Sequence, residues 1–107
     1  MIFMPVFVWQ NRELIRINPE EIVCLQAEKN YVWFHLVGKK SYMVRTTMES
    51  ALEKLPPDIF LRMHRSFAVS VLFIKTVHND HADVGGSSLP IGKKYYKALI
   101  NKLTVVD

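Results

Sequence analysis

Apolar residues recur along this chain of 107 residues with two different periods. A period of two, which is typical of half-buried strands, dominates residues 3–45 and returns from residue 60 onward. The run from Tyr31 to Val37 is the clearest, because every second residue from Val32 is Val, Phe or Leu before the turn at Gly38. We expect strands over residues 3–9, 13–17, 22–27 (an apolar run covered on both faces), 31–37, 41–45, 60–64, 72–79 and 81–84, and a short extended piece at 89–91.

A helical period of apolar residues appears twice. Thr46 followed by Glu49 fits a capping box, and the helix that it opens ends at Pro56-Pro57. The apolar face of this helix consists of Met48, Ala51, Leu52 and Leu55, and that of a second helix near residue 100 consists of Tyr96, Leu99, Ile100 and Leu103. Residues 66–70 are expected to form an irregular crossing with room for a helical turn, and residues 85–88 a loop. The pattern therefore predicts a mainly β fold with two short helices.

The stretch from Phe60 to Ser70, FLRMHRSFAVS, carries the most informative polar residues. In an extended backbone Phe60, Arg62 and His64 share one face, while Leu61 and Met63 point into a core. Arg65 and Ser66 then fall where the strand stops. A guanidinium beside an imidazole and a hydroxyl offers several hydrogen-bond donors, which suit phosphate oxygens or the edge of a guanine.

Size and composition point to one domain over residues 1–107, because 107 residues that are 50% hydrophobic suffice for one core but not two. The apolar start lacks the features of a signal peptide, and no apolar run is long enough to insert into a membrane. The single Cys24 lies in an apolar run, so we interpret it as a buried thiol in a reducing cytoplasm. We find no phosphate-binding glycine loop, nucleophile elbow or carboxylate pair, so we expect neither an enzyme nor a cofactor.

Positive charge is unevenly distributed along the chain. The net charge is +4 and the pI about 9.3. Acidic residues are absent from three windows, Lys29 to Met48, Ile59 to Asn79 and Val84 to Val106, which hold 11 of the 14 Lys and Arg residues. Lys93, Lys94 and Lys97 crowd the first half of the second helix, where cations oppose the helix dipole. A phosphate backbone nearby would explain that placement, and ordinary solvated lysines are the alternative.

The order of motifs from about Phe3 to Leu103 resembles the LytTR DNA-binding domain of bacterial transcription regulators. The match rests on Ile22, Leu25 and Ala27 before Asn30-Tyr31-Val32, on Tyr42-Met43-Val44-Arg45 and Thr47-Met48, on residues 60–69 against the family pattern F-x-R-x-H-R-S-[FY]-x-V, on Ile74, and on Leu89-Pro90-Ile91 before a basic helix. The resemblance implies an elongated fold of small antiparallel sheets, in which loops, not a recognition helix, enter successive DNA grooves.

The resemblance also implies where bases are contacted, with one place in each acid-free window. These places are Lys29 and Asn30, then Arg65, then Gly92 with Lys93 and Lys94. The DNA-binding residues expected in all are Lys29, Asn30, Arg45, Arg62, His64, Arg65, Ser66, Lys93, Lys94 and Lys97. Family members commonly carry Ser then Arg where this chain has Gly92 and Lys93, which replaces a planar fork by a point charge. Phosphate attraction is kept there, whereas base preference is weakened.

Several of these residues have a structural interpretation beside the functional one. His64 is better explained as a brace for the turn that carries Arg65 than as a base contact. Ser66 either caps a helical turn or contacts phosphate, and the sequence favours neither. Tyr31 and Trp33 are interpreted as core residues, with cross-strand pairing as the second interpretation, in preference to platforms that stack on bases. The motif H-N-D-H-x-D from His78 has metal-ligand residue types, but Asn-Asp also suits a hairpin turn, which we prefer.

Three functions remain open on the sequence. The first is sequence-specific binding of double-stranded DNA in transcription regulation, by two copies on adjacent direct repeats about one helical turn apart. The second is an interaction module whose basic face docks an acidic protein, and the third is a metal-dependent nuclease. Family members often carry a receiver domain before this one, whereas this chain begins at the first strand. The expected control is therefore a separate signalling protein, the concentration of the domain itself, or a missing part of a longer regulator.

Overall fold

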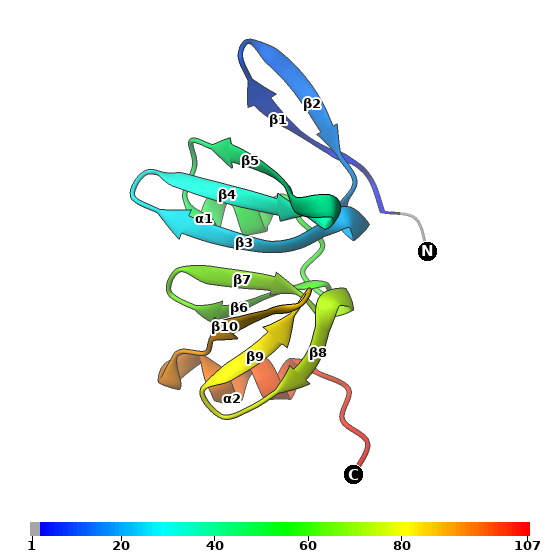
Figure 1. Cartoon of the computed structure of the whole chain (residues 1–107), viewed down its shortest axis with the longest axis vertical. Coiled ribbons are helices and arrows are strands. Elements are labelled where there is room, and N and C mark those ends of the chain that lie inside the picture. The colour runs from blue at the N-terminus through cyan, green and yellow to red at the C-terminus, as the bar shows by residue number, and fades with distance from the viewer. Residues whose placement is uncertain (1–2) are drawn as a thin grey trace.

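The computed structural model describes residues 3–107, which form ten strands and two helices (Figure 1). The strands are β1 Val6–Gln10, β2 Glu13–Ile17, β3 Ile22–Glu28, β4 Tyr31–Leu36, β5 Lys40–Val44, β6 Phe60–His64, β7 Phe67–Ser70, β8 Ile74–Val77, β9 His81–Val84 and β10 Ser87–Pro90. The helices are α1 Met48–Glu53 and α2 Lys93–Lys102, and single 3-10 turns cover Pro19–Glu21, Val37–Lys39 and Val71–Phe73. The expected class is confirmed: a mainly β fold, elongated at 47 × 33 × 24 Å.

Three antiparallel sheets are stacked along the longest axis (Figure 1). The β1–β2 hairpin lies at one end, a five-stranded sheet in the order β5-β4-β3-β7-β6 lies in the middle, and the sheet β10-β9-β8 lies at the other end with α2. Strand β3 is central and is covered on both faces, as its apolar sequence predicts, because Leu25 and Cys24 point to opposite sides and are both buried.

Two hydrophobic cores lie on opposite faces of the five-stranded sheet. One is shared with α1 and the β1–β2 hairpin and includes Ile17, Leu25 and Met48. The other is shared with the three-stranded sheet and α2 and includes Val69 and Leu99. A chain of this length thus builds two small cores on one sheet, although its composition suggested one.

Strand β6 contributes to both cores. Leu61 and Met63 are buried in the second, as expected. Phe60 is also buried, at 5% exposure, in the core beneath α1. The alternation of faces is therefore right for Phe60, but its face is not open to solvent at that end of the strand. A register shift between Arg62 and His64 against β7 marks where β6 becomes irregular.

Three local predictions are wrong. The cap of α1 is Thr47, whose Oγ1 accepts from Ser50 N–H at 3.1 Å, so the capping box from Thr46 does not form. Residues 66–70 contain the strand β7, which pairs with both β3 and β6. The helical turn comes later, and Ser70 caps it by accepting from Leu72 N–H at 3.3 Å, so Ser66 caps no helical turn. Of the loop expected over residues 85–88, only the two glycines turn, since β10 begins at Ser87.

Candidate nucleic-acid interface

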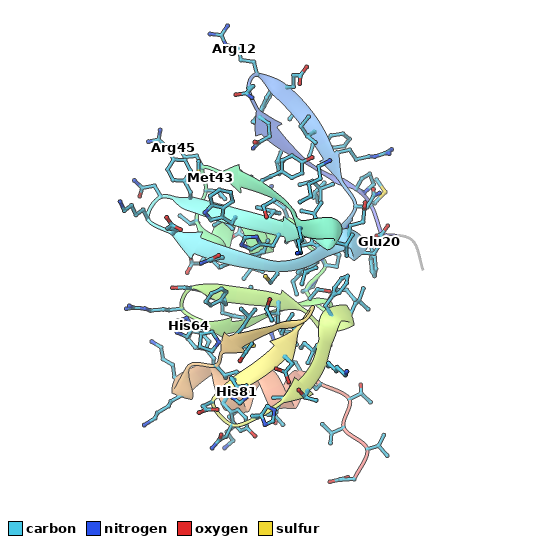
Figure 2. The ribbon with its side chains drawn as sticks, in the orientation of Figure 1. Arg12, Glu20, Met43, Arg45, His64 and His81 are labelled. Carbon is cyan, nitrogen blue, oxygen red and sulfur yellow. The ribbon has the colours of Figure 1, made fainter. Side chains whose placement is uncertain are left out.

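The fold brings three turns to one side of the molecule, which we call the basic side: the β3–β4 turn, the β6–β7 turn and the start of α2. They follow one another along the long axis (Figure 1). Each belongs to a different acid-free window, so sequence positions about 30 residues apart are now neighbours on one surface. Arg45, which directly follows β5, and His64 point to this same side (Figure 2). The three places expected to contact bases are therefore brought together.

The β3–β4 turn consists of two exposed residues, Lys29 and Asn30, between the paired residues Glu28 and Tyr31. Lys29 has φ +56°, in the left-handed region that side chains other than glycine, asparagine and aspartate rarely adopt. The tight pairing imposes this conformation. It places a lysine and a primary amide at the tip of a rigid hairpin.

The β6–β7 turn is held by the guanidinium of Arg62. Its Nε donates to the carbonyl oxygen of His64 at 2.9 Å, and its Nη2 donates to the carbonyl oxygen of Arg65 at 2.5 Å. Its Nη1 lies 3.4 Å from Glu49 Oε2 on α1, and its side chain is only 24% exposed. The pKa of Glu49 is lowered, first by its own backbone N–H and then by Arg62. Arg62 thus fixes the backbone from which the exposed Arg65 projects.

His64 braces the same turn from the inside. Its Nδ1 accepts from the backbone N–H of Ser66 at 3.0 Å, which assigns the ring proton to Nε2, and its ring centroid lies 5.8 Å from that of Phe67. This geometry agrees with the bracing interpretation of His64. The carbonyl oxygen of Ser66 accepts from Ala27 N–H at 2.8 Å, two residues before Lys29. A backbone bond therefore sets the distance between the first and second turns.

The start of α2 is joined to the β6–β7 turn as well. Gly92 N–H donates to the carbonyl oxygen of Met63 at 2.9 Å and caps α2 without a side chain. A Cβ at Gly92 would lie 2.9 Å from Cδ2 of Tyr95, so the ring occupies the space where most side chains would begin. The cations of Arg62 and Lys94 each lie 5.8 Å from the centre of that ring. Lys93, Lys94 and Lys97 are exposed on the first turns of the helix.

The family profile described as the LytTr DNA-binding domain matches residues 12–104. The chain belongs to the LytTr DNA-binding domain family. It is 28% identical over 93 residues to the sensory transduction protein LytT of Enterococcus faecalis (strain ATCC 700802 / V583), a match that covers 81% of this chain and 38% of that protein. The chain therefore spans well under half the length of this curated relative.

A solved LytTr DNA-binding domain from Bacillus cereus has the same fold. The TM-score is 0.78 at 20% sequence identity, and the match covers 92% of this chain and 94% of that one. Family membership supports DNA binding in transcription regulation, and the LytTr family is a DNA-binding family, not an enzyme family. Within residues 3–107 we find no helix long and apolar enough to cross a membrane.

Two aromatic residues of this LytTr domain lie outside both cores, contrary to our prediction. Tyr31 is 36% exposed, and Trp33 is half-buried, with its ring stacked on His35 at 6.2 Å between centroids and 9° between planes. Trp33 pairs across the sheet with Gln26 and Met43. The core interpretation fails because this part of the sheet face has no covering layer, whereas the cross-strand interpretation of Trp33 agrees with the register.

The motif H-N-D-H-x-D forms the β8–β9 turn and the start of β9, at the opposite end of the domain from Arg12 (Figure 2). Asn79 and Asp80 make its turn, as preferred from the sequence. The rings of His78 and His81 are stacked at 4.1 Å, and His81 Nδ1 lies 2.7 Å from Asp80 Oδ1. Among the described residues no three His, Cys, Asp or Glu side chains are arranged to hold a metal ion.

Cys24 is a buried thiol, as expected, and burial raises its pKa to about 11. It therefore stays protonated at neutral pH and is no nucleophile. Sequence reasoning missed two other residues, Glu49 and Tyr95, which contact Arg62 from α1 and α2. For Tyr95 the sequence offered one signal. It lies three residues after Gly92, and residues at that spacing lie together on one helix face.

Proposed function

We propose that this LytTr domain binds double-stranded DNA sequence-specifically through the three turns of its basic side. The observation that carries the proposal is the pair of backbone bonds, Ala27 to Ser66 and Gly92 to Met63, which fix the three turns relative to one another. Exposed cations and the amide of Asn30, held in a rigid row, are complementary in charge and hydrogen bonding to successive phosphates and base edges. The site residues are Lys29, Asn30, Arg45, Arg62, His64, Arg65, Ser66, Lys93, Lys94 and Lys97.

These residues divide into three roles. Asn30 and Arg65 are exposed at turn tips and have the forked side chains that read adenine and guanine edges. The exposed lysines and Arg45 attract phosphates, with Lys29, Lys93 and Lys94 near enough to the tips to reach bases. Arg62 and His64 contribute to DNA binding indirectly, because they hold the β6–β7 turn in place. The Ser66 hydroxyl is proposed to contact a phosphate.

Two copies on paired direct repeats are proposed, because one small domain covers little DNA. One helical turn is roughly 34–36 Å. The domain is 47 Å long, so copies centred one turn apart must tilt away from the duplex axis. Copies aligned with that axis would instead occupy repeats two turns apart. The partners proposed are thus DNA, a second copy on the same DNA and a separate signalling protein, all in the cytoplasm.

The test is selection of bound sequences from random duplex DNA at near-physiological salt, repeated with Arg65→Ala and Lys97→Ala. We expect a pair of short motifs whose separation reports the spacing. Arg65→Ala should cost about 1–3 kcal/mol and blur one base position. Lys97→Ala, the matched control, should weaken all sequences alike and lower the salt slope by about one unit. Salt-sensitive binding without an enriched motif would mean that the domain binds DNA nonspecifically through its positive charge. No binding would favour the alternative, a module whose basic face docks an acidic protein.

A further inference from the structure

Part of one face of the five-stranded sheet has no covering layer. The three-stranded sheet and α2 pack over β6, β7 and part of β3, whereas the same face of β4 and β5 contributes no residue to the core beneath them. A groove of about 590 Å³ lies where the cover ends. It is lined chiefly by Val23, Gln26, His35, Phe67, Phe73 and Leu89. This volume falls in the range of sites that hold small molecules.

The groove is lined by several hydrogen-bond donors and by one cation. The residues that line it include no Asp or Glu, and they include Lys39 and Ser87 at the mouth. His35 is bonded at both nitrogens, to Ser41 Oγ at 2.8 Å and to Gln26 Oε1 at 3.0 Å, which leaves the amide hydrogens of Gln26 for a ligand. An apolar channel with a cation, an amide and a hydroxyl at its rim is complementary to an apolar molecule that carries one anionic group.

The turn that supplies Lys39 is strained. Gly38 and Lys39 have φ +76° and +61°, and the second value is unfavourable for a lysine. Residues held in sparsely populated backbone conformations cluster at ligand sites and active sites. The strained backbone thus carries Lys39, the one lysine or arginine among the residues that line the groove.

The groove reaches the basic side through one side chain. Phe67 lines the groove, and its ring lies 5.8 Å from that of His64. His64 in turn accepts from the backbone N–H of Ser66, next to Arg65. A molecule that contacts Phe67 is therefore separated from the β6–β7 turn by a single packed ring.

We propose that this groove binds a small amphipathic anion, an aromatic or branched aliphatic carboxylate or sulfonate, and that its occupancy acts on the β6–β7 turn through Phe67. The first part of this proposal, that the groove binds such an anion (the binding half), depends on the groove alone. The second part, that occupancy acts on the β6–β7 turn (the coupling half), rests on the proposed function. Because such coupling is reciprocal, a ligand that changes the affinity of the domain for DNA by a given factor has its own affinity changed by DNA by the same factor.

The binding half is tested with 8-anilinonaphthalene-1-sulfonate and amide chemical shifts of the domain without DNA. We expect shifts at Phe67, Phe73 and Leu89. Shifts confined to the exposed Phe7 and Trp9 of the β1–β2 hairpin would show nonspecific apolar binding and overturn the proposal. Because no DNA is present, this result is independent of the proposed function.

Three variants locate the probe. Ser87→Trp should fill the groove and abolish the shifts, and Lys39→Gln should weaken binding at least about fivefold. Ser88→Trp is the matched control, since Ser88 is also exposed but does not line the groove. Equal effects of both tryptophans would overturn the site. On a selected DNA site, saturating probe should change DNA affinity about fivefold or more. An unchanged affinity, with specific DNA binding intact, would overturn the coupling half alone.

Discussion

Replacing Arg62 with methionine should destabilise the domain although Arg62 lies beside the surface expected to contact DNA. The substitution removes two charge-assisted hydrogen bonds, to the carbonyl oxygens of His64 and Arg65, and the cation over the ring of Tyr95. Such bonds contribute about 1.5–3 kcal/mol each, and the lower value applies because water can reach the turn. A cation over an accessible ring adds about 0.5 kcal/mol. The expected loss of unfolding free energy is therefore about 3.5 kcal/mol.

Urea unfolding measures this loss. With a slope near 1.5 kcal/mol/M, the midpoint should fall by about 2 M. Arg62→Lys should recover only part of it, because an ammonium on a flexible stem cannot reproduce the fixed fork that reaches both carbonyls. Glu49→Gln, which removes only the exposed ion pair, should leave the midpoint nearly unchanged. A loss below about 0.5 kcal/mol for the methionine variant, as for an ordinary surface site, would refute the bracing role of Arg62.

DNA binding by the same variant separates the two roles of Arg62. A brace predicts that Arg62→Met blurs preference for the base that we propose Arg65 reads, while the salt dependence keeps its slope. A direct phosphate contact predicts a slope lower by about one unit and an unchanged base preference. Binding to the selected site and to its single-base variants, measured between low and physiological salt, distinguishes the two.

Three further perturbations test other parts of the structure. Gly85→Ala should cost about 2–4 kcal/mol in a urea titration, because φ is +56° and the new Cβ would lie 2.5 Å from Val23 Cγ1; the control Gly86→Ala, at φ +85° with open space, should cost only about 1 kcal/mol, and equal losses would contradict the contact. Lys29→Gly should raise stability by about 0.5 kcal/mol in a thermal melt by relieving the left-handed strain, yet weaken DNA binding; a loss of stability would show that the strain is absent. Burial lowers the pKa of His35 below 6.5, so the folded state takes up its proton later than the unfolded state does. The stability that His35 contributes is thus present above pH 6.5 and lost as pH falls through its folded pKa, and urea midpoints at pH 7.5 and 5.5 should diverge less in His35→Gln than in the parent. An unaltered divergence would assign the pH dependence elsewhere.

The sequence predicted what depends on local pattern. Alternation located most strands, the change of period at residue 46 located α1, and the family motif pointed to Arg65 at a turn. Prediction from the sequence failed where contacts between distant segments determine the local structure. Residues 67–70 become a strand only because β3 and β6 lie on either side of them. The helical turn expected within residues 66–70 therefore lies later, at Val71–Phe73.

Exposure and side-chain partners were equally hard to predict. Trp33 alternates as a core residue does, but the covering sheet stops short of β4, and no pattern along one strand shows how far its cover extends. The partners of Arg62 were hidden for a related reason: Glu49 and Tyr95 approach from two helices that are distant in the chain. Side chains with several donors can be recognised in a sequence, whereas the groups that accept from them cannot.

The backbone bonds from Ala27 to Ser66 and from Gly92 to Met63 also bear on how such a domain changes its target. The atoms that set the separation of the three turns belong to the main chain, so substitutions at Asn30, Arg65 or Lys93 leave that separation intact. Under the proposed function, descendants of one ancestor would therefore drift to new operators one base at a time while the length of the recognised site stayed constant. Retargeting by design has the same freedom, since each turn tip can be randomised separately.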